Sequence, residues 1–410
     1  MEKIVLIDDD PIFRRVAEKR LTSAGYRVVA AGDGKTGLQV ARAEQPDLVL
    51  LDLMMPGLHG FAVIQEIRND PVLRDTQVIV SSGKVYPVDV KKAKELGANA
   101  YLTKPYDLDT LVETIRALLA AAGVKVAVRF WGTRGSIPTP GPSTLRYGGN
   151  TSCVEVRYGD HILIFDCGSG AREMGMALSR EFKGRQLDLH LFVSHTHWDH
   201  IQGFPFFVPA YVPGNRLTIY SSRGADKSLE KVFTGQMDAT YFPVSLTDLM
   251  ARLQFVELEG VVTLGEGKIS HMYLNHPGLA IGFRIDVGGK SVVYLTDHEQ
   301  YRRMLGDNEH NREQDLQVTE FARGADLYIR EAQYTDDEYR TKVGWGHSTW
   351  SDVLESAHDT NARQLALYHH DPLHDDEIMD GIVNDCHAYM ERRGMAFTCV
   401  AASDNLQVIV

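Results

Sequence analysis

Short apolar runs alternate with amphipathic stretches over the first 121 residues of the chain. Four runs, at residues 3–7, 48–51, 78–80 and 100–103, have the length and the apolar character of buried strands. Between and after them, apolar positions recur with the helical period. This alternation predicts βα units that build a parallel sheet covered by helices. The helices are expected at residues 12–24, 34–44, 62–69, 88–96 and 108–121.

Each of these predicted strands ends in a polar group. The carboxyl ends of parallel strands meet at one edge of the sheet, where ligands of such sheets generally bind. Carboxylates that follow one another repel at neutral pH, so a cation such as Mg²⁺ is expected to hold them together. The groups gathered at this edge are Asp8, Asp9, Asp52, Ser81 and Lys104.

These motifs resemble a response-regulator receiver domain, and the resemblance covers residues 1–123. It implies a flavodoxin-like, doubly wound fold in which Asp52 accepts a phosphoryl group from a sensor histidine kinase or a phosphotransfer protein. It also implies Mg²⁺ held by Asp8, Asp9, Asp52 and the backbone near Met54. A receiver that keeps the fold but no longer accepts phosphate is the alternative. The implied switch residues are Ser81, Tyr101 and Lys104.

In the second part of the chain, an apolar run at residues 189–193 leads directly into the segment SHTHWDH. A strand with this ending brings three imidazoles and a carboxylate to one point, which suits two adjacent divalent metal ions. The alternative, a turn with merely exposed histidines, requires four ligand-type residues within six positions by chance. The candidate ligands are His195, His197, Asp199 and His200.

The segment resembles the HxHxDH signature of the metallo-β-lactamase-fold hydrolases. The resemblance implies that residues 124–410 form an αβ/βα sandwich and that further ligands follow later strands. Zn²⁺ is the expected ion, although the same ligands accept Mn²⁺ or Fe. The implied ligand sets are His195, His197 and His276 for one metal, Asp199, His200 and His369 for the other, and Asp297 shared by both.

Two further residues, His370 and Asp166, have alternative interpretations. His370 would replace His369 if the match were shifted by one position. Asp166, after the predicted strand at residues 161–165, matches an aspartate that in this family supports the metal ligands without binding metal. A buried aspartate that caps a turn is the alternative for Asp166.

His347 lies in a Gly-His-Ser-Thr segment that precedes a predicted helix at residues 351–359. This segment resembles the accessory histidine motif of the ribonuclease Z-like phosphodiesterase branch. The resemblance implies that His347 stabilises phosphate charge or protonates the leaving oxygen, with Asp199 and Asp297 as the other catalytic residues. A histidine without chemistry at a helix N-terminus is the alternative.

The implied function is a response regulator with a dinuclear-metal phosphodiesterase output, acting on small cyclic or nucleotide diesters and controlled by phosphorylation of Asp52. Two alternatives stay open. One is a metal-dependent hydrolase of carboxyl esters, lactones or thioesters, and the other is a metal-bound signalling platform without turnover.

The distribution of net charge along the chain limits which binding partners are expected. Of the net charge of −12, residues 1–124 contribute −1, with 16 basic and 17 acidic residues, and the remainder contributes −11. The acidic charge of the second part disfavours the binding of nucleic acid, although a local positive groove beside the metals remains an alternative. The aromatic stretches within residues 204–255 favour core packing or a homodimer contact over a substrate pocket.

Compartment and redox state follow from what the sequence lacks. No apolar run has the length of a membrane span, and the N-terminus turns acidic before a signal-peptide core develops. We therefore expect a cytoplasmic protein with no membrane partner. Four cysteines without a CxxC pair predict reduced thiols.

Overall fold

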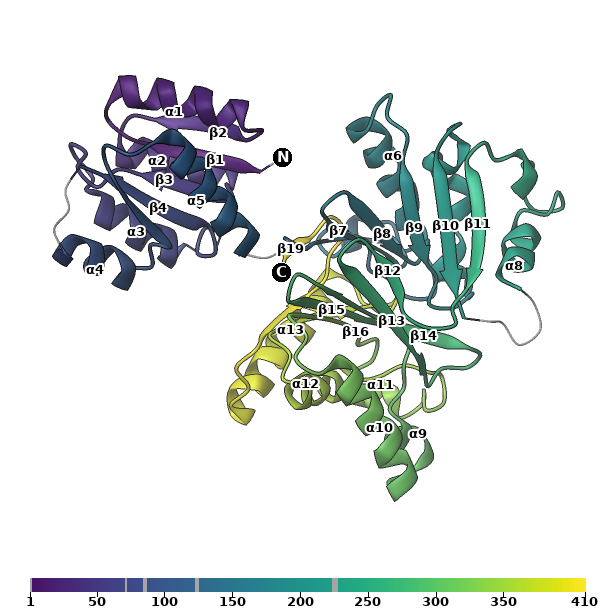
Figure 1. The fold of residues 1–410 in the computed structure, drawn as a ribbon. Helices are drawn as coiled ribbons and strands as arrows, with labels where there is room; N and C mark the ends of the chain where they lie inside the picture. Colours follow the sequence, from purple (N-terminus) through teal and green to yellow (C-terminus); the bar gives the residue numbers. More distant parts are fainter. Residues whose placement is uncertain (1, 71, 84–86, 122–124, 223–227) are drawn as a thin grey trace. The chain divides into compact units, whose positions relative to one another are not determined.

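The chain has two compact units, Met1–Gly123 and Val124–Val410 (Figure 1). The computed structural model describes residues 2–70, 72–83, 87–121, 125–222 and 228–410. The joint around Gly123 lies outside the described residues. None of the described helices combines the length and the apolarity that a membrane crossing needs.

The first unit is built on a parallel sheet of five strands in the order β2-β1-β3-β4-β5. This order confirms the predicted doubly wound, flavodoxin-like fold. Strand β2 is not among the predicted strands, although its residues 28–31 form an apolar run; it lies at the sheet edge, and most of its residues are only partly buried. The strands are β1 (Lys3–Ile7), β2 (Arg27–Ala31), β3 (Leu48–Leu51), β4 (Gln77–Ser82) and β5 (Ala100–Thr103).

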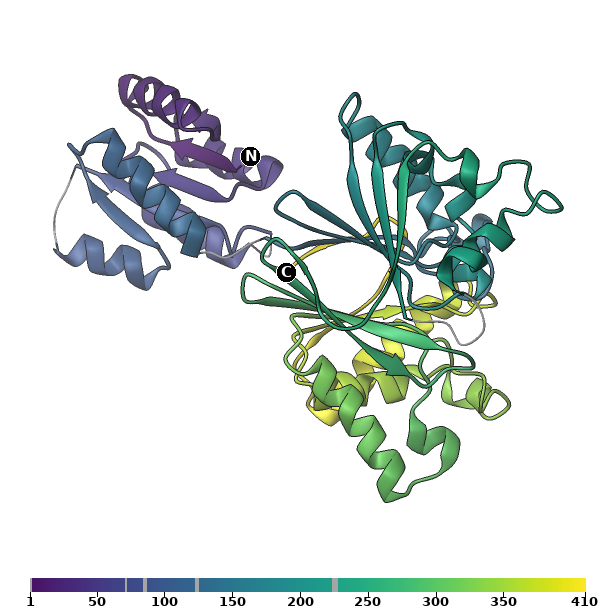
Figure 2. The same ribbon diagram turned by 45° about the vertical axis from the view of Figure 1, so that its right-hand side comes forward.

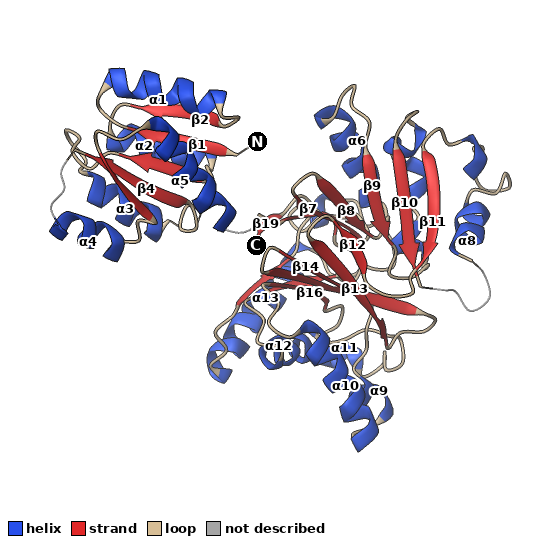
Figure 3. Cartoon of the chain, viewed as in Figure 1, coloured by secondary structure: helices blue, strands red, loops and turns tan. Residues whose placement is uncertain are grey.

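Helices cover both faces of this sheet, as Figure 3 shows. Because side chains alternate along a strand, β1 buries Ile4 and Leu6 on one face and Val5 and Ile7 on the other. Helices α1 and α5 pack on the first face, and α2, α3 and α4 pack on the second. The helices are α1 (Pro11–Ser23), α2 (Gly34–Glu44), α3 (Gly60–Asn69), α4 (Pro87–Glu95) and α5 (Leu108–Ala121).

The second unit contains two mixed sheets of seven strands each. Their orders are β11-β10-β9-β8-β7-β6-β19 and β12-β13-β14-β15-β16-β17-β18. The first sheet comprises β6 (Ala127–Gly132), β7 (Cys153–Tyr158), β8 (His161–Phe165), β9 (Asp188–Phe192), β10 (Arg216–Ser221), β11 (Arg252–Glu257) and β19 (Gln407–Ile409). The second comprises β12 (Val262–Leu264), β13 (Gly267–Leu274), β14 (Ala280–Val287), β15 (Lys290–Leu295), β16 (Leu327–Glu331), β17 (Gln364–Tyr368) and β18 (Thr398–Ala401).

The two sheets face each other across an aromatic core, with helices on their outer sides (Figure 2). Phe165, Phe192, Phe283 and Tyr294 meet in this core, with ring centroids 5.3 to 5.7 Å apart for the Phe165 pairs. This layering confirms the predicted αβ/βα sandwich. The helices are α6 (Gly170–Glu181), α7 (Trp198–Ile201) and α8 (Leu229–Gln236) on one side, and α9 (Tyr301–Leu305), α10 (Glu309–Ala322), α11 (Asp336–Tyr339), α12 (Trp350–Asp359) and α13 (Asp376–Arg393) on the other.

Strand direction explains where polar side chains gather. Strands β8 and β9 are parallel, so both end at the same edge of the first sheet. In the second sheet β15, β16 and β17 are parallel, and β13 runs the same way because two antiparallel pairings separate it from β15. The residues that follow these strands therefore collect at one edge of the sandwich.

The aromatic stretches between residues 204 and 255 contribute mainly to the core. Phe204, Phe207 and Phe233 are fully buried in the cluster that joins α6 and α8 to the first sheet. Phe206 is 54% exposed and Tyr241 is 80% exposed. Core packing therefore accounts for part of these stretches and leaves two aromatic side chains on the surface.

Candidate metal centre

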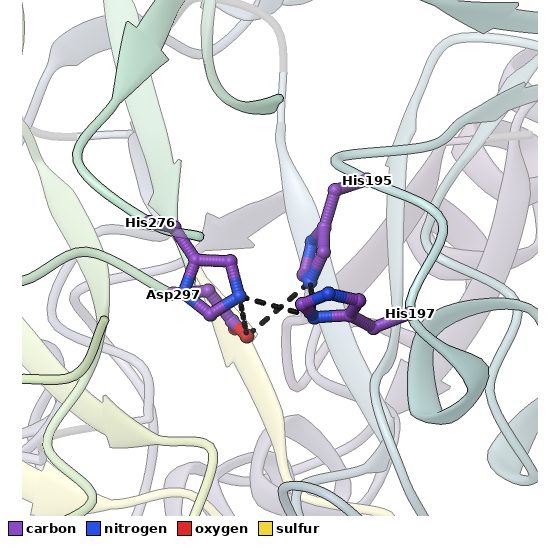
Figure 4. Close-up of side chains that lie close together, drawn as sticks. All are labelled: His195, His197, His276 and Asp297. Carbon is purple, nitrogen blue, oxygen red and sulfur yellow. Dashed lines mark hydrogen bonds and ion pairs between the residues drawn. The ribbon is translucent and has the colours of Figure 1, made fainter. Parts of the chain in front are cut away.

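Three histidines and one aspartate converge where β9, β13 and β15 end (Figure 4). Nε2 of His195 and Nε2 of His276 lie 3.0 and 3.1 Å from Nδ1 of His197. The same two Nε2 atoms lie 3.4 and 3.6 Å from Oδ2 of Asp297. The structure thus brings the side chains predicted for one metal within ligand distance of a common point.

A second group adjoins the first through Asp297. Oδ1 of Asp297 lies 3.4 Å from Nε2 of His200 and 3.3 Å from Nε2 of His369. Oδ2 of Asp199 lies 3.3 and 3.0 Å from the same two nitrogens. Each oxygen of Asp297 therefore faces a different ligand group, which is the arrangement a carboxylate shared by two cations requires.

The turns that present these side chains have unusual backbone geometry. Asp297 and His369 adopt positive φ angles of 35° and 55°, and Asp166 adopts 60°. Non-glycine residues rarely occupy this left-handed region, and such strain is concentrated at functional sites. Asp166 and His369 directly follow β8 and β17, and Asp297 follows the end of β15 by two positions, so each strained turn lies at the carboxyl end of a strand.

Asp166 supports the centre from the first sheet. Its Oδ1 accepts a hydrogen bond from the backbone N–H of Ser194 at 2.7 Å. Its Oδ2 lies 2.8 Å from Nδ1 of His200 and accepts from the hydroxyl of Tyr294 at 2.7 Å. With a proton on Nδ1, the Nε2 atom of His200 is free to face the ligand groups. The structure gives Asp166 contacts of both predicted kinds, to the turn and to a candidate ligand.

Other candidate ligands are also held by neighbouring groups: His276 and His369 through Nδ1, and Asp199 through Oδ2. Nδ1 of His276 lies 3.0 Å from the carbonyl oxygen of Gly346, and Nδ1 of His369 lies 2.9 Å from Oε1 of Gln333. The backbone N–H of Ser136 donates to Oδ2 of Asp199 at 2.7 Å. His370, the alternative to His369, faces away and lies 2.8 Å through Nε2 from the carbonyl oxygen of Ala402.

Electrostatics at the centre favour a cation. Burial alone would raise the pKa of Asp297, but the neighbouring histidines hold it well below its ordinary value. Burial alone would lower the pKa of His200, yet Asp199 and Asp297 raise it well above its ordinary value. Nε2 of His200 is buried and lacks a hydrogen-bond partner among the described residues. The donor set therefore calls for positive charge at this point and fits divalent ions such as Zn²⁺, Mn²⁺ or Fe²⁺.

His347 lies beside the centre at the wall of a cavity. Its ring centroid is 5.2 Å from those of both His276 and His369. Burial lowers its pKa to about 3, so the imidazole is neutral. Its Nδ1 lies 3.8 Å from Oε2 of Glu331, whose pKa burial raises to about 7. The cavity has a volume of about 480 Å³ and is lined by Ser136, Thr196, His197, Trp198, Asp199, Asp297, His347 and His369.

Several contact residues were absent from the sequence-based predictions. Glu331 ends strand β16, whose first three residues are a short apolar run, so a signal similar to that for Asp297 was available. Ser136 acts through its backbone N–H, which no side-chain pattern reveals. Gly135 is required for packing, because a Cβ atom there would lie 2.4 Å from Nδ1 of His369. Gln333 and Tyr294 gave no spacing signal.

The polar edge of the first unit has its own cluster. Asp8, Asp9 and Asp52 lie close enough for one cation. Lys104 donates through Nζ to Oδ2 of Asp8 at 2.5 Å and to Oδ2 of Asp52 at 2.8 Å. The backbone N–H of Met54 donates to Oδ1 of Asp52 at 2.9 Å. The carboxylates of Asp8, Asp9 and Asp52 thus lie at the same sheet edge as the lysine.

The predicted switch residues flank this cluster. Ser81 lies within β4 itself, since the strand extends through Ser82. The hydroxyl groups of Ser81 and Tyr106 are 2.6 Å apart. Tyr101 lies on the edge strand β5 and is partly buried, and burial raises its pKa.

Two family models match the chain. The model described as response regulator receiver domain matches residues 4–116. The model described as beta-lactamase superfamily domain matches residues 161–370, just over half of the 410 residues. The two matches fall within the first and second units, respectively.

Individual relatives agree with these matches. Protein PilH of Pseudomonas aeruginosa is 38% identical over 120 residues, which cover 29% of this chain and 99% of PilH. The probable transcriptional regulator ycf27 of Guillardia theta is 41% identical over 118 residues, 29% of this chain and 45% of that protein. The chain thus spans just under half of the length of ycf27.

Among solved structures, the metallo-beta-lactamase fold protein YhfI of Bacillus subtilis has a TM-score of 0.51 to this chain. The superposition covers 70% of this chain and 100% of YhfI at 18% sequence identity. At this identity the similarity concerns the fold alone.

Proposed function

Because the chain belongs to the response-regulator receiver family in its first unit and to the beta-lactamase superfamily in its second, we propose a response regulator with a dinuclear-metal phosphodiesterase as output. The substrates are small cyclic or nucleotide phosphodiesters. One observation carries the proposal: five imidazoles and two carboxylates form two adjoining ligand groups around Asp297, beside a cavity that also contains His347.

The residues that would hold the cations are those of the two ligand groups. His195, His197 and His276 would bind one ion, Asp199, His200 and His369 the other, and Asp297 both. Two such cations lower the pKa of a water molecule towards neutrality and neutralise phosphoryl oxygens during an in-line displacement.

Three residues of the chain would act on substrate and water in the cavity. Asp199 and Asp297 line it, so their carboxylates can accept hydrogen bonds from the attacking water. His347 lines it as a neutral imidazole that can donate a hydrogen bond to a phosphoryl oxygen. The negative charge of a bound diester raises the pKa of this imidazole and prepares it to protonate the leaving oxygen.

The proposal is tested by hydrolysis of bis-p-nitrophenyl phosphate by the zinc-loaded or manganese-loaded protein. We expect turnover by wild type, a loss of at least about 100-fold in Asp199→Ala, and a loss of about 10²–10⁴-fold in kcat for His347→Ala. The matched control is His310→Ala, which removes an exposed histidine of α10. Full metal loading without diester turnover would refute the phosphodiesterase. In that event, turnover of ester, lactone or thioester substrates would identify the alternative hydrolase.

We propose further that a sensor histidine kinase or a phosphotransfer protein controls this activity by phosphorylating Asp52. Support comes from the position of Asp52 between Lys104 and the acidic pair at one sheet edge. Treatment with acetyl phosphate and Mg²⁺ should change the rate of diester hydrolysis in wild type but not in Asp52→Asn. Equal rates with and without the phosphodonor, in protein shown by mass to be phosphorylated, would refute this control.

A further inference from the structure

Glu299 is a fully buried carboxylate two positions after Asp297, and two of its three hydrogen-bond donors come from the segment that directly precedes His347. We propose that Glu299 is a positioning residue that holds this segment against His276 and thereby aligns both a metal ligand and His347. The proposed alignment of the metal ligand His276 is argued from the ligand geometry. The proposed effect on catalysis through His347 rests on the proposed function.

The carboxylate of Glu299 binds three donors. Its Oε1 accepts from the hydroxyl of Tyr339 at 2.5 Å and from the backbone N–H of Gly344 at 2.9 Å. Its Oε2 accepts from the backbone N–H of Gly344 at 3.0 Å and of Gly346 at 2.8 Å. Two of the three donors thus belong to one short segment, residues 344–346, named here the glycine segment.

The glycine segment in turn fixes His276. The carbonyl oxygen of Gly346 lies 3.0 Å from Nδ1 of His276, which favours the tautomer with its proton on Nδ1. Nε2 is then left to face His197 and Asp297, at 3.1 and 3.6 Å, as Figure 4 shows. A chain of two hydrogen bonds therefore leads from Glu299 through Gly346 to the candidate ligand.

Gly346 has little freedom to move. Its φ angle is +88°, and a Cβ atom there would lie 2.1 Å from Nδ1 of His276. The peptide must approach the imidazole this closely to accept its hydrogen bond, so only glycine fits. A glycine peptide is flexible when unbound, and the bond to Glu299 supplies the restraint that the residue itself lacks.

The same restraint extends to His347. The backbone N–H of Gly346 donates to Glu299, and the backbone N–H of Ser348 donates to Oε1 of Glu331 at 2.7 Å. His347 lies between these two anchored peptides. Loss of either carboxylate would release one side of the turn that directs the imidazole into the cavity.

The backbone of Glu299 links to the same ligand. Its N–H donates to the carbonyl oxygen of Asn275 at 2.9 Å, and Nδ2 of Asn275 donates to the carbonyl oxygen of Glu299 at 2.8 Å. Asn275 directly precedes His276, and Glu299 follows Asp297 by two positions. Glu299 therefore ties together the turns that carry two candidate ligands as well as the glycine segment.

The test compares Glu299→Ala with the conservative Glu299→Gln. In the glutamine variant, Oε1 can accept from Gly344 and Gly346 while Nε2 donates to the hydroxyl oxygen of Tyr339. The matched control is Glu155→Ala, which removes another buried carboxylate, bound to Nε1 of Trp131 at 2.7 Å on strand β7. The readouts are zinc per chain after dialysis against a weak chelator, the visible spectrum of the Co²⁺-loaded protein, and kcat for bis-p-nitrophenyl phosphate.

We expect Glu299→Ala to bind the ion at His195, His197 and His276 about 10–100-fold more weakly, with a changed Co²⁺ spectrum. Glu299→Gln should restore wild-type stoichiometry and spectrum, and Glu155→Ala should retain both. Wild-type zinc affinity and spectrum in Glu299→Ala would overturn the proposal. The same metal loss in Glu155→Ala would also overturn it, since general destabilisation would then explain both variants.

Two further outcomes are distinguishable: failure of the variant to fold and failure of the proposed function. If Glu299→Ala does not fold, Gly346→Ala tests the same path from its other end, and an unchanged Co²⁺ spectrum in that variant would overturn the proposal. If wild type binds two metal ions but hydrolyses no diester, the proposed function fails, and the zinc and Co²⁺ readouts still decide the role of Glu299.

Discussion

Oδ2 of Asp166 lies 2.8 Å from Nδ1 of His200, although Asp166 follows β8 and His200 lies in α7, which follows β9. The same oxygen accepts a hydrogen bond from Tyr294 of the second sheet. A single buried carboxylate thus links both sheets to one candidate metal ligand.

This link predicts the effect of changing Asp166. In Asp166→Asn the amide can still accept from Ser194, but it cannot serve all the donors around the carboxylate. We expect zinc affinity to fall about 10–100-fold, with the fold retained. Isothermal titration with zinc measures the affinity, and circular dichroism monitors the fold. Unchanged affinity would show that Asp166 only caps its turn.

The adjacent pair His369 and His370 allows a test of register. His369 faces Asp199 and Asp297, whereas His370 contacts the carbonyl oxygen of Ala402. We expect His369→Ala to lose zinc and His370→Ala to keep wild-type zinc content with a lower Tm, because a buried hydrogen bond is lost. Metal analysis of the two proteins decides between them, and zinc loss confined to His370→Ala would reverse the assignment.

Trp198, which lies between His197 and Asp199 in the sequence, is 81% exposed and lines the cavity. Stacking of a nucleobase on such a ring contributes about 1–3 kcal/mol. We therefore expect Trp198→Ala to raise KM about 5–150-fold for a cyclic nucleotide, and Trp198→Phe to raise it less. KM for an alkyl glycerophosphodiester should stay constant, as should all constants in the surface control Val261→Ala. Equal KM changes for both diesters would refute base stacking.

The raised pKa of Asp404 leads us to predict that the stability of the fold depends on pH. Burial raises its pKa to about 6, above the ordinary value of 3.8. The folded state therefore binds more protons than the unfolded state between about pH 4 and 6, and this group destabilises the fold as the pH rises through that window. The penalty above pH 6 is on the order of 3 kcal/mol.

The variant Asp404→Asn removes this dependence, because the amide stays neutral, accepts from Asn150 and can donate to Thr133. Urea unfolding of both proteins at pH 4 and pH 7 measures how the free energy of unfolding depends on pH. We expect the variant to gain stability relative to wild type only at pH 7. An equal difference at both pH values would contradict the prediction.

The sequence determined both folds and most of the candidate site. Apolar runs that lead into Asp52, His195 or Asp297 mark both the buried strands and the polar groups that gather at their carboxyl ends, since a parallel strand buries its length and exposes its carboxyl end. The edge strand β2 was not predicted, although its residues 28–31 are apolar; it pairs with β1 alone, and most of its residues are only partly buried.

Only the tertiary structure decided which residues meet. His276, Asp297 and His369 are far apart in sequence, and the directions of β13, β15 and β17 bring them to one edge. The choice of His369 over His370 depends on a single left-handed turn. The supports of the site, such as the N–H of Ser136 and the carboxylate of Glu299, act through backbone groups of distant segments. Such contacts depend on close approach in space, which no local pattern of side chains encodes.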